Sequence, residues 1–458
     1  MYNKNAWHKY KNKKPVMDFS DGYKDFLTKA KTERLAVEEA VKILKAHGFK
    51  EMHSFKKVKT GDKIYIVNRN KNVAAFIIGK KPISEGLHIL GSHIDSPRID
   101  LKQNPLYEDT GFAMLDTHYY GGVKKYQWTT LPLALIGVVC KKDGSIININ
   151  IGLDKNDPIF TINDLLIHLS DKQLQQPAKT IITGENLDIT FASIPLEGAK
   201  EEAVKENVLK LLKEKYHFDE EDFTSAEIEA VPAYAARDCG IDRSMVASYG
   251  QDDRSCAYAS LMAIATADAK KVTYTSCLIL VDKEEIGSLG ATGAESYFIE
   301  NVLLDLVYMH EEKHPTLKTR TAFRNSKMIS SDVTAASDPL FKEVNAPHRN
   351  MARFGHGVCF NKYSGHRGKS GNNDANPEFI AYLRKILDDN GIDHQSSEIG
   401  AVDAGGGGTI SYALAKYNMD VVDAGVPLLA MHSPLEVISK VDLYEAYLFY
   451  KAFLLTNK

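Results

Sequence analysis

The sequence predicts an α/β protein in which a β-rich domain is inserted into a domain of alternating helices and strands. Helical and strand-like segments alternate near both ends of the chain, which is typical of a sheet covered by helices on both faces. Between these parts, strand-like segments follow one another, joined by turn signals. We therefore expect a discontinuous first domain at 1–104 and 240–458 and an inserted domain at 105–239.

Composition narrows the class of protein. The 458 residues are 44% hydrophobic and 26% charged, with a formal net charge of −3, which gives no indication of binding to nucleic acid or to an anionic membrane surface. No stretch approaches the roughly 20 apolar residues of a membrane span, and the first twenty residues lack the apolar segment of a signal peptide. The five cysteines are dispersed without a CxxC pair. We therefore expect a cytoplasmic protein whose cysteines are reduced and are not zinc ligands.

Helical periodicity opens the first domain. Apolar residues repeat at helical spacing over 23–47, and Ser20 and Asp21 just before them can cap a helix. Strand-like runs follow at 63–67 and 73–78. Together these segments predict a layer of helix and strand that leads into a central sheet.

The inserted part is rich in strand signals. Two β-rich runs, 131–140 and 145–151, flank the pair Asp143-Gly144, and an Asp-Gly turn between such runs is a strong hairpin signal. Further elements are expected as strands at 180–183 and 188–193 and as a helix at about 198–216.

Alternation of helix and strand resumes from about residue 241. The expected helices are 255–269, 377–389, 409–417 and 434–455, and the expected strands are 274–281, 327–330, 419–422 and 428–431. This return to alternation completes the predicted α/β sheet.

An HxD pattern closes the apolar run 87–92. His93 would lie at the carboxyl end of a buried strand, where open α/β sheets place their ligands. In an extended chain Asp95 lies on the same side as His93 and can orient the imidazole toward a metal. The pattern is weak alone, and it gains weight from acidic residues downstream.

Four later segments deliver hard metal ligands in the same manner. They contain Asp252 and Asp253 before a helix, Glu284 and Glu285 after a strand, Asp332 after another strand, and His432 after a third. Any one of them alone is more often a helix cap or a solvated loop residue. Together they form a mixed nitrogen and oxygen set suited to zinc, with cobalt and manganese as alternatives. Such a set can hold two metals about 3.5–4 Å apart if one carboxylate bridges them.

A different zinc motif is present at His310–His314, which spells HExxH. A single-zinc endopeptidase would need both histidines on one helical face. Pro315 biases His314 away from helical geometry, so we interpret this match as a coincidence.

Five motifs resemble the family of aspartyl aminopeptidase and vacuolar aminopeptidase I. They are HIDSPR at 93–98, GQDDR at 250–254, DKEEIGS at 282–288, SSD at 330–332 and MHSP at 431–434. The segment KYSGHRGKSGNNDAN at 362–376 resembles the vacuolar type more closely. The resemblance implies a mixed-sheet zinc-exopeptidase catalytic domain with an inserted β-rich dimerisation domain. It also implies two zinc ions per subunit, peptide substrates and self-association into a tetrahedral homododecamer.

The resemblance also implies individual roles. The implied ligands are His93, Asp252 and Asp332 for one metal, and Asp252, Glu285 and His432 for the other. Asp252 would bridge, with Asp253 as the alternative. Asp95 would orient His93, and Glu284 would be the general base that forms a metal-held hydroxide. Lys362 resembles a lysine that contacts substrate, and His168 resembles a histidine lent by a neighbouring subunit.

Specificity is where the sequence departs from the aspartyl enzymes. Three residues after the metal aspartate those enzymes carry a histidine, and this chain has Ala335. An acidic substrate would need a cationic partner in the pocket, for which Lys362, Arg367 and Lys369 are the candidates. We expect an aminopeptidase that prefers neutral residues, with acidic specificity as the alternative. A deacylase is less favoured, and so is a catalytically silent scaffold, which has no need of an intact ligand set and Glu284.

Overall fold

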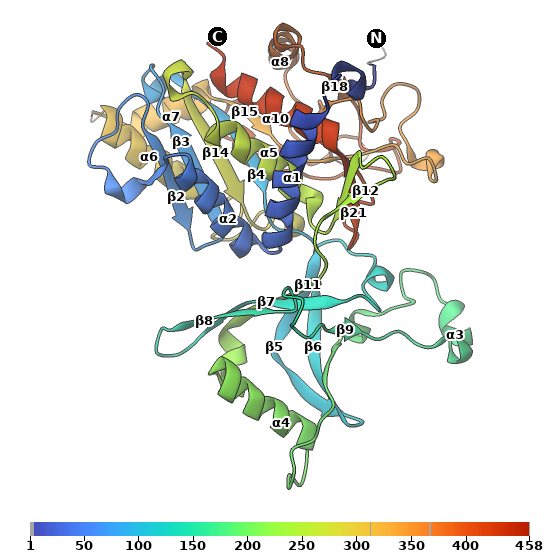
Figure 1. Cartoon of the computed structure of the whole chain (residues 1–458). Coiled ribbons are helices and arrows are strands. Elements are labelled where there is room, and N and C mark those ends of the chain that lie inside the picture. The colour runs from blue at the N-terminus through green and yellow to red at the C-terminus, as the bar shows by residue number, and fades with distance from the viewer. Residues whose placement is uncertain (1–3, 312, 366–367, 458) are drawn as a thin grey trace. The chain divides into compact units, whose positions relative to one another are not determined.

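A computed structural model describes residues 4–311, 313–365 and 368–457 (Figure 1). The chain divides into two compact units. The first contains residues 1–95, 236–431 and 435–458, and the second contains 96–235 and 432–434.

A nine-stranded mixed sheet forms the centre of the first unit. Its strand order is β1 (Lys50–Glu51), β2 (Lys63–Asn68), β3 (Asn72–Ile77), β14 (Thr275–Val281), β4 (Leu87–His93), β15 (Lys327–Ser330), β19 (Asp420–Gly425), β17 (Val358–Asn361) and β18 (His394–Ser396). The four strands β14, β4, β15 and β19 are parallel to one another, whereas β3 and β17 run antiparallel to their neighbours in this group. The predicted α/β class with a mixed sheet is therefore confirmed.

The parallel strands end close together at one edge of the sheet. Every residue of β4 and β14 is buried, which explains the uninterrupted apolar runs, because parallel strands are covered on both faces. The register pairs Val281 with His93 and Ser330 with Gly91. Residues that follow β14 and β15 therefore lie near His93.

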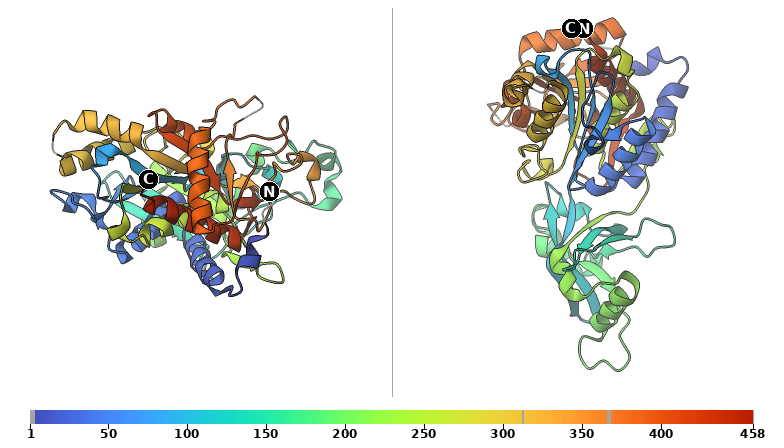
Figure 2. Two further views of the ribbon diagram at one scale, coloured as in Figure 1. Left: turned by 90° about the horizontal axis from the view of Figure 1, so that it is seen from above. Right: turned by 90° about the vertical axis from the view of Figure 1, so that its left-hand side faces the viewer.

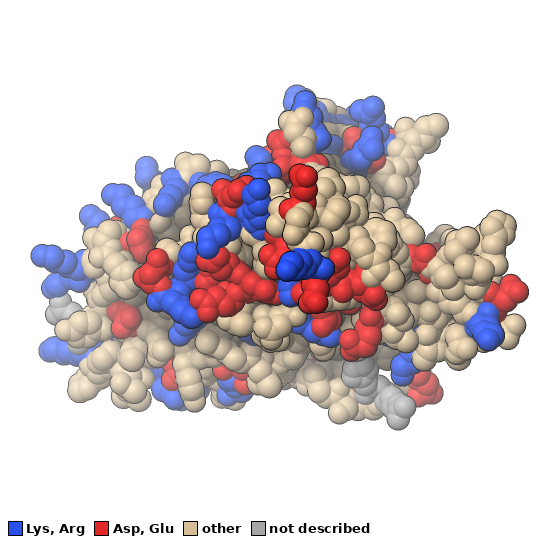
Figure 3. Space-filling view, turned by 90° about the horizontal axis from the view of Figure 1, so that it is seen from below, with Lys and Arg blue, Asp and Glu red and all other residues tan. Residues whose placement is uncertain are grey.

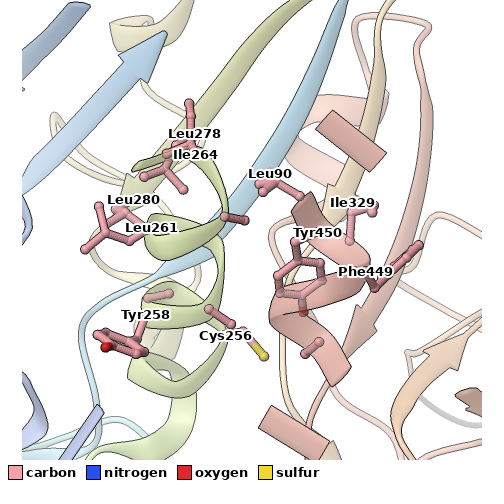
Figure 4. Packing of buried hydrophobic residues seen from close by; sticks show 14 of the residues in the cluster. Leu90, Cys256, Tyr258, Leu261, Ile264, Leu278, Leu280, Ile329, Phe449 and Tyr450 are labelled. Carbon is pink, nitrogen blue, oxygen red and sulfur yellow. The ribbon is translucent and has the colours of Figure 1, made fainter. Parts of the chain in front are cut away.

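Helices cover both faces of this sheet (Figure 2). One face packs against α1 (Lys14–Lys29), α2 (Glu33–Ala46), α5 (Gln251–Ala265), α8 (Pro377–Asn390) and α10 (Lys440–Leu455), and the other against α6 (Phe298–Glu311), α7 (Pro315–Asn325) and α9 (Ser411–Ala415). Successive residues of β4 alternate between the faces, so Ile89 belongs to one apolar core and Leu90 to the other. Figure 4 shows Leu90 with Leu261 of α5 and Tyr450 of α10.

A smaller sheet supports the start of α5. Its order is β12 (Arg237–Cys239), β13 (Met245–Ser248), β21 (Glu436–Ser439), β20 (Pro427–Leu429) and β16 (Thr334–Ala335). The pairing of Ser248 with Glu436 places the first residue of β21 beside the turn that leads into α5.

The second unit is built on a seven-stranded antiparallel sheet. Its order is β8 (Ile146–Ile151), β7 (Leu133–Cys140), β11 (Ala226–Pro232), β5 (Arg98–Asp109), β6 (Phe112–Tyr120), β10 (Ile189–Ala192) and β9 (Thr161–Ile162). The expected hairpin is confirmed: β7 and β8 pair across a turn in which Gly144 has φ 86° and the N–H of Lys141 donates to Ser145 O. The helix expected at 198–216 is shorter, with α4 at Ala203–Leu211 followed by one π turn.

Three element predictions were wrong. The helix expected at 23–47 is two helices, because the Thr32 side chain accepts the N–H of Leu35 and caps α2. Ser20 is no cap, since it lies inside α1 and donates to Val16 O. The strand expected at 180–183 is a turn. The last helix begins at Lys440, because the residues before it pair as β21 with β13 and β20.

The surface gives two further observations. On the face shown in Figure 3, basic and acidic side chains are interspersed. Within the described ranges, every helix is too short or too polar to cross a lipid bilayer.

Candidate metal centre

The ends of β4 and β15 and the start of α5 bring three donors together. His93, Asp252 and Asp332 each offer one ligand atom, and these atoms lie within 4.8 Å of one another. His93 Nε2 is 3.1 Å from Asp252 Oδ1 and 3.9 Å from Asp332 Oδ1. All three side chains are buried. One imidazole and two carboxylates in a closed space are a donor set that suits zinc.

Two glutamates lie beside this group, on the short 3₁₀ turn Glu284–Ile286 that follows β14. His93, Glu284 and Glu285 also offer ligand atoms within 4.8 Å of one another. Lys283 before the turn and Gly287 after it have φ of 68° and 97°. These left-handed residues reverse the chain tightly, which keeps both glutamates at the strand end.

Asp95 holds the histidine and the glutamate turn at once. Its carboxylate accepts the backbone N–H groups of Glu284 and Glu285, both at 3.2 Å. His93 Nδ1 is 3.3 Å from Asp95 Oδ1. Since Asp95 is fully buried, these contacts fix the imidazole and both glutamate backbones in one arrangement.

Asp252 and Asp253 have different surroundings. Their backbone torsions are not helical, and a cis peptide bond joins them. The Asp253 carboxylate accepts Ser92 Oγ–H at 2.5 Å and the N–H of Cys256 at 3.1 Å. It therefore stabilises the first turn of α5, while Asp252 faces His93.

The electrostatics of this cluster favour a cation. Burial, followed by the neighbouring carboxylates Asp253 and Asp252, holds the pKa of Asp332 well above its usual range, although His93 opposes the shift. Burial also raises the pKa of Asp253 to about 8. Burial lowers the pKa of His93, but its contacts with Asp252 and Asp95 outweigh this and raise it overall. Buried carboxylates at this spacing are costly without positive charge, so the residues fit a divalent metal.

The structure gives the other expected residues these positions. His432 is grouped with the second unit, where its Nδ1 lies 3.0 Å from Gly122 O. Lys362 and Lys369 both form ion pairs with Asp374, at 3.1 and 3.3 Å. Arg367 lies outside the described residues.

His168 lies in the second unit, on the short 3₁₀ turn Ile167–Leu169. Its neighbours Leu166, Ile167 and Leu169 expose 53%, 65% and 69% of their surface. Consecutive apolar side chains with this exposure form a surface that a partner could cover.

The HExxH match does not form a zinc site. His310 lies in α6, whereas His314 precedes α7 with φ 52°. Glu311 accepts the N–H of Ser84 and pairs with Lys318. The two histidines therefore do not share a helical face, and Glu312 between them lies outside the described residues.

Sequence reasoning missed Glu436, because it falls where a helix was expected. Glu436 is buried, and its Oε2 accepts the N–H of Gln251 at 2.7 Å and of Asp252 at 3.2 Å. The Gln251 side chain donates back to Glu436 O, and its amide oxygen accepts the hydroxyl of Tyr23. A carboxylate on the first N–H groups of a helix stabilises that helix start, and here it also orients Asp252.

Gly425 was missed as well. A Cβ at this position would lie 1.9 Å from the backbone oxygen of Asp332 and 2.8 Å from Cys256 Sγ. Only glycine lets β19 approach Asp332 this closely. A glycine at a strand end was a visible signal in the sequence, but it did not identify its neighbour.

Comparison with known proteins agrees with this geometry. The family model described as aminopeptidase I zinc metalloprotease (M18) matches residues 26–454. A probable M18 family aminopeptidase 1 from Clostridium acetobutylicum is 53% identical, over 98% of each chain. The crystal structure of an M18 family aminopeptidase from Thermotoga maritima has a TM-score of 0.96 at 44% identity, over 99% of each chain. The structure titled as the S. cerevisiae mApe1 dodecamer has a TM-score of 0.77 at 21% identity, over 95% of this chain and 96% of that one.

The fold and the donor cluster define a metal-dependent hydrolase of the α/β class. The chain belongs to the M18 family of zinc aminopeptidases, so the resemblance seen in its motifs is confirmed. It is accordingly a metalloaminopeptidase.

Replacing Glu436 should weaken metal binding without contacting the metal. In Glu436→Leu the N–H groups of Gln251 and Asp252 lose their acceptor, so we expect zinc affinity to fall by about 10–100-fold, the usual cost of losing a group that orients a ligand. Glu436→Gln keeps an amide oxygen and should lose much less. Competition with a chromophoric chelator measures both affinities. A folded Leu variant with the parent's zinc affinity would show that Glu436 does not orient Asp252.

Proposed function

We propose that the chain is a binuclear zinc aminopeptidase that removes neutral amino-terminal residues from short peptides. One observation carries the proposal: His93, Asp252 and Asp332 share one position, and the glutamate pair lies against the same histidine. Two overlapping donor groups suit two metals better than one. Cobalt and manganese suit the same donors.

In this proposal His93, Asp252 and Asp332 hold one zinc ion, and Asp252, Glu285 and His432 hold the other. Asp252 is favoured over Asp253 as the bridge, since the Asp253 carboxylate is already engaged by Ser92 and Cys256. His432 comes from the sequence pattern. Residues 432–434 are joined at both ends, through Met431 and Leu435, to the first unit, so the chain limits how far His432 can lie from it.

Zinc bound here would act as a Lewis acid on the scissile carbonyl and would acidify a water molecule. Glu284 is the residue proposed to take the proton from that water and pass it to the leaving amine. Asp95 fixes the backbone of Glu284, so the base stays in place during the transfer. The buried surroundings limit competing water and strengthen each electrostatic contact.

Glu284 and Glu285 should differ in phenotype. Glu284→Gln should retain both metals and lose roughly 10²–10⁴-fold in kcat, the contribution of a positioned general base. Glu285→Gln should lose metal first. Metal content per subunit and kcat for a leucyl substrate are measured together. Glu311→Gln, in the HExxH segment, serves as the control and should stay near the parent. The opposite pattern, with Glu311 essential and Glu284 dispensable, contradicts the assignment.

Neutral specificity is proposed from the charges near the substrate loop. Lys362 and Lys369 both pair with Asp374, and Ala335 supplies no charge. Lysines already paired with a carboxylate have less to offer an acidic substrate, because the substrate must displace Asp374. Lys362 is then better suited to a backbone oxygen of any peptide.

The proposal predicts higher kcat/KM for leucyl and alanyl substrates than for aspartyl and glutamyl ones. The four substrates are compared at equal metal loading. An advantage of tenfold or more for an acidic residue, about 1.4 kcal/mol in the transition state, would return the chain to the aspartyl type. Asp374→Asn then separates the causes, since releasing both lysines should improve acidic substrates more than neutral ones.

Self-association is proposed from the second unit, with the homododecamer named for the yeast protein as the model. The apolar residues beside His168 favour burial against another copy, and the proposed role of His168 is to reach a neighbour's substrate. The five cysteines are free, which fits the reducing cytoplasm as the proposed location.

Light scattering should therefore give a mass many times the 50.9 kDa of one chain. Leu169→Asp should reduce that mass, because a charge in the buried interface is costly. Ile194→Asp is the matched control, since Ile194 is equally exposed at 71% and lies outside the His168 segment. A monomer with full peptidase activity contradicts both the assembly and the shared histidine.

A further inference from the structure

A basic cavity lies in the first unit, at the edge strand β18 and helix α8. Its volume is about 450 Å³. Three arginines and two histidines line it: Arg349, Arg353, Arg384, His356 and His394. Among the lining residues that the structure describes, none carries a carboxylate. In a chain with a net charge of −3, five basic side chains around one cavity produce a local positive potential.

The carboxylates on neighbouring segments are engaged elsewhere. Asp393, next to His394, lies 3.8 Å from Lys9. Glu398 accepts the hydroxyl of Tyr363. On α8, Asp389 pairs with Lys385. These pairings leave the positive potential of the cavity without compensation from the acidic groups nearest in the chain.

Part of the cavity is built firmly. The Gln395 side chain accepts the N–H of Arg353 and donates to Arg353 O, both at 2.8 Å. It also donates to Gly357 O. His356 and His394 each place Nδ1 near a carbonyl oxygen of their own chain segment. If Nδ1 carries the proton in both rings, Nε2 is an acceptor that becomes a second donor on protonation.

The rest of the lining is apolar. Met351, Phe360 and Ile380 contribute to it, and Phe360 and Ile380 belong to the core or pack against it. A ligand that fits both parts carries a negative group for the arginines, which bind phosphate and carboxylate well, and an apolar group for this wall.

The cavity is separate from the metal centre. Three strands' steps lead from β15 and four from β4 to β18, so β18 lies about 19 Å from β4 at the usual strand spacing. A group bound here cannot touch the reacting atoms.

We infer that this cavity is a second ligand site, which binds a small organic anion: a phosphate or carboxylate joined to an apolar group. The arginines hold the anion, and the apolar wall holds the remainder. The site is independent of the proposed chemistry at Glu284, so each can fail without the other.

Calorimetry on the metal-loaded protein tests the site with phenyl phosphate and phenylacetate, and with phenol as the neutral control. We expect one saturable site per subunit for at least one of the two anions, and none for phenol. The tighter of the two identifies the anionic group. Arg384→Gln should weaken binding at least about fivefold, in keeping with the loss of a charge-assisted hydrogen bond. Lys385→Gln removes the same charge one residue along α8 and should change the affinity less than twofold.

Three outcomes overturn the inference. The first is the absence of saturable binding at millimolar concentration. The second is binding that Arg384→Gln leaves unchanged and that chelation abolishes, because the anion then occupies the metal centre. The third is a change in particle mass in Arg384→Gln without anion binding to the parent, because the cavity then receives an acidic segment of another copy.

Discussion

The convergence of acidic side chains at one edge of a parallel sheet is the constraint on which this structure depends. Asp252 and Asp332 lie within a few ångströms of His93, and Asp95 and Asp253 are buried behind them. Charges so close repel one another, and water cannot screen them. The arrangement is stable only where a cation supplies the missing charge, so the acidic site and its metal requirement have the same physical cause.

Neutral donors hold these acids in place. Asp95 accepts two backbone N–H groups, and Asp253 accepts a hydroxyl and one N–H. Glu436 accepts two more N–H groups. Neutral donors orient a carboxylate without cancelling its charge. The cluster is therefore rigid and still strongly negative, which are the two properties that a tight site for divalent ions needs.

The sequence was informative where local chemistry decides structure. Buried parallel strands announce themselves as apolar runs, so the end of β4 and the ligands after β14 and β15 could be expected. The break at Thr32 was missed because the apolar repeat continues across it. Glu436 was missed for another reason: its role depends on pairing with Ser248, nearly 190 positions away along the chain. Such long-range register is not visible in local periodicity.

The same register relates the two ends of the sheet. Cys359 of β17 pairs with Gly425 of β19, and Gly425 packs on the backbone of Asp332. The amino-terminal ends of β17 and its parallel neighbour β18 therefore lie at the edge where the metal ligands gather. Along this edge the charge changes from acidic at β4 to basic at β18. A free peptide has the complementary polarity, since its amine is positive and its carboxylate negative. If phenylacetate binds the basic cavity better than phenyl phosphate, this polarity identifies the ligand as a peptide's carboxyl end, and extended peptides of about six residues would be long enough to span both sites.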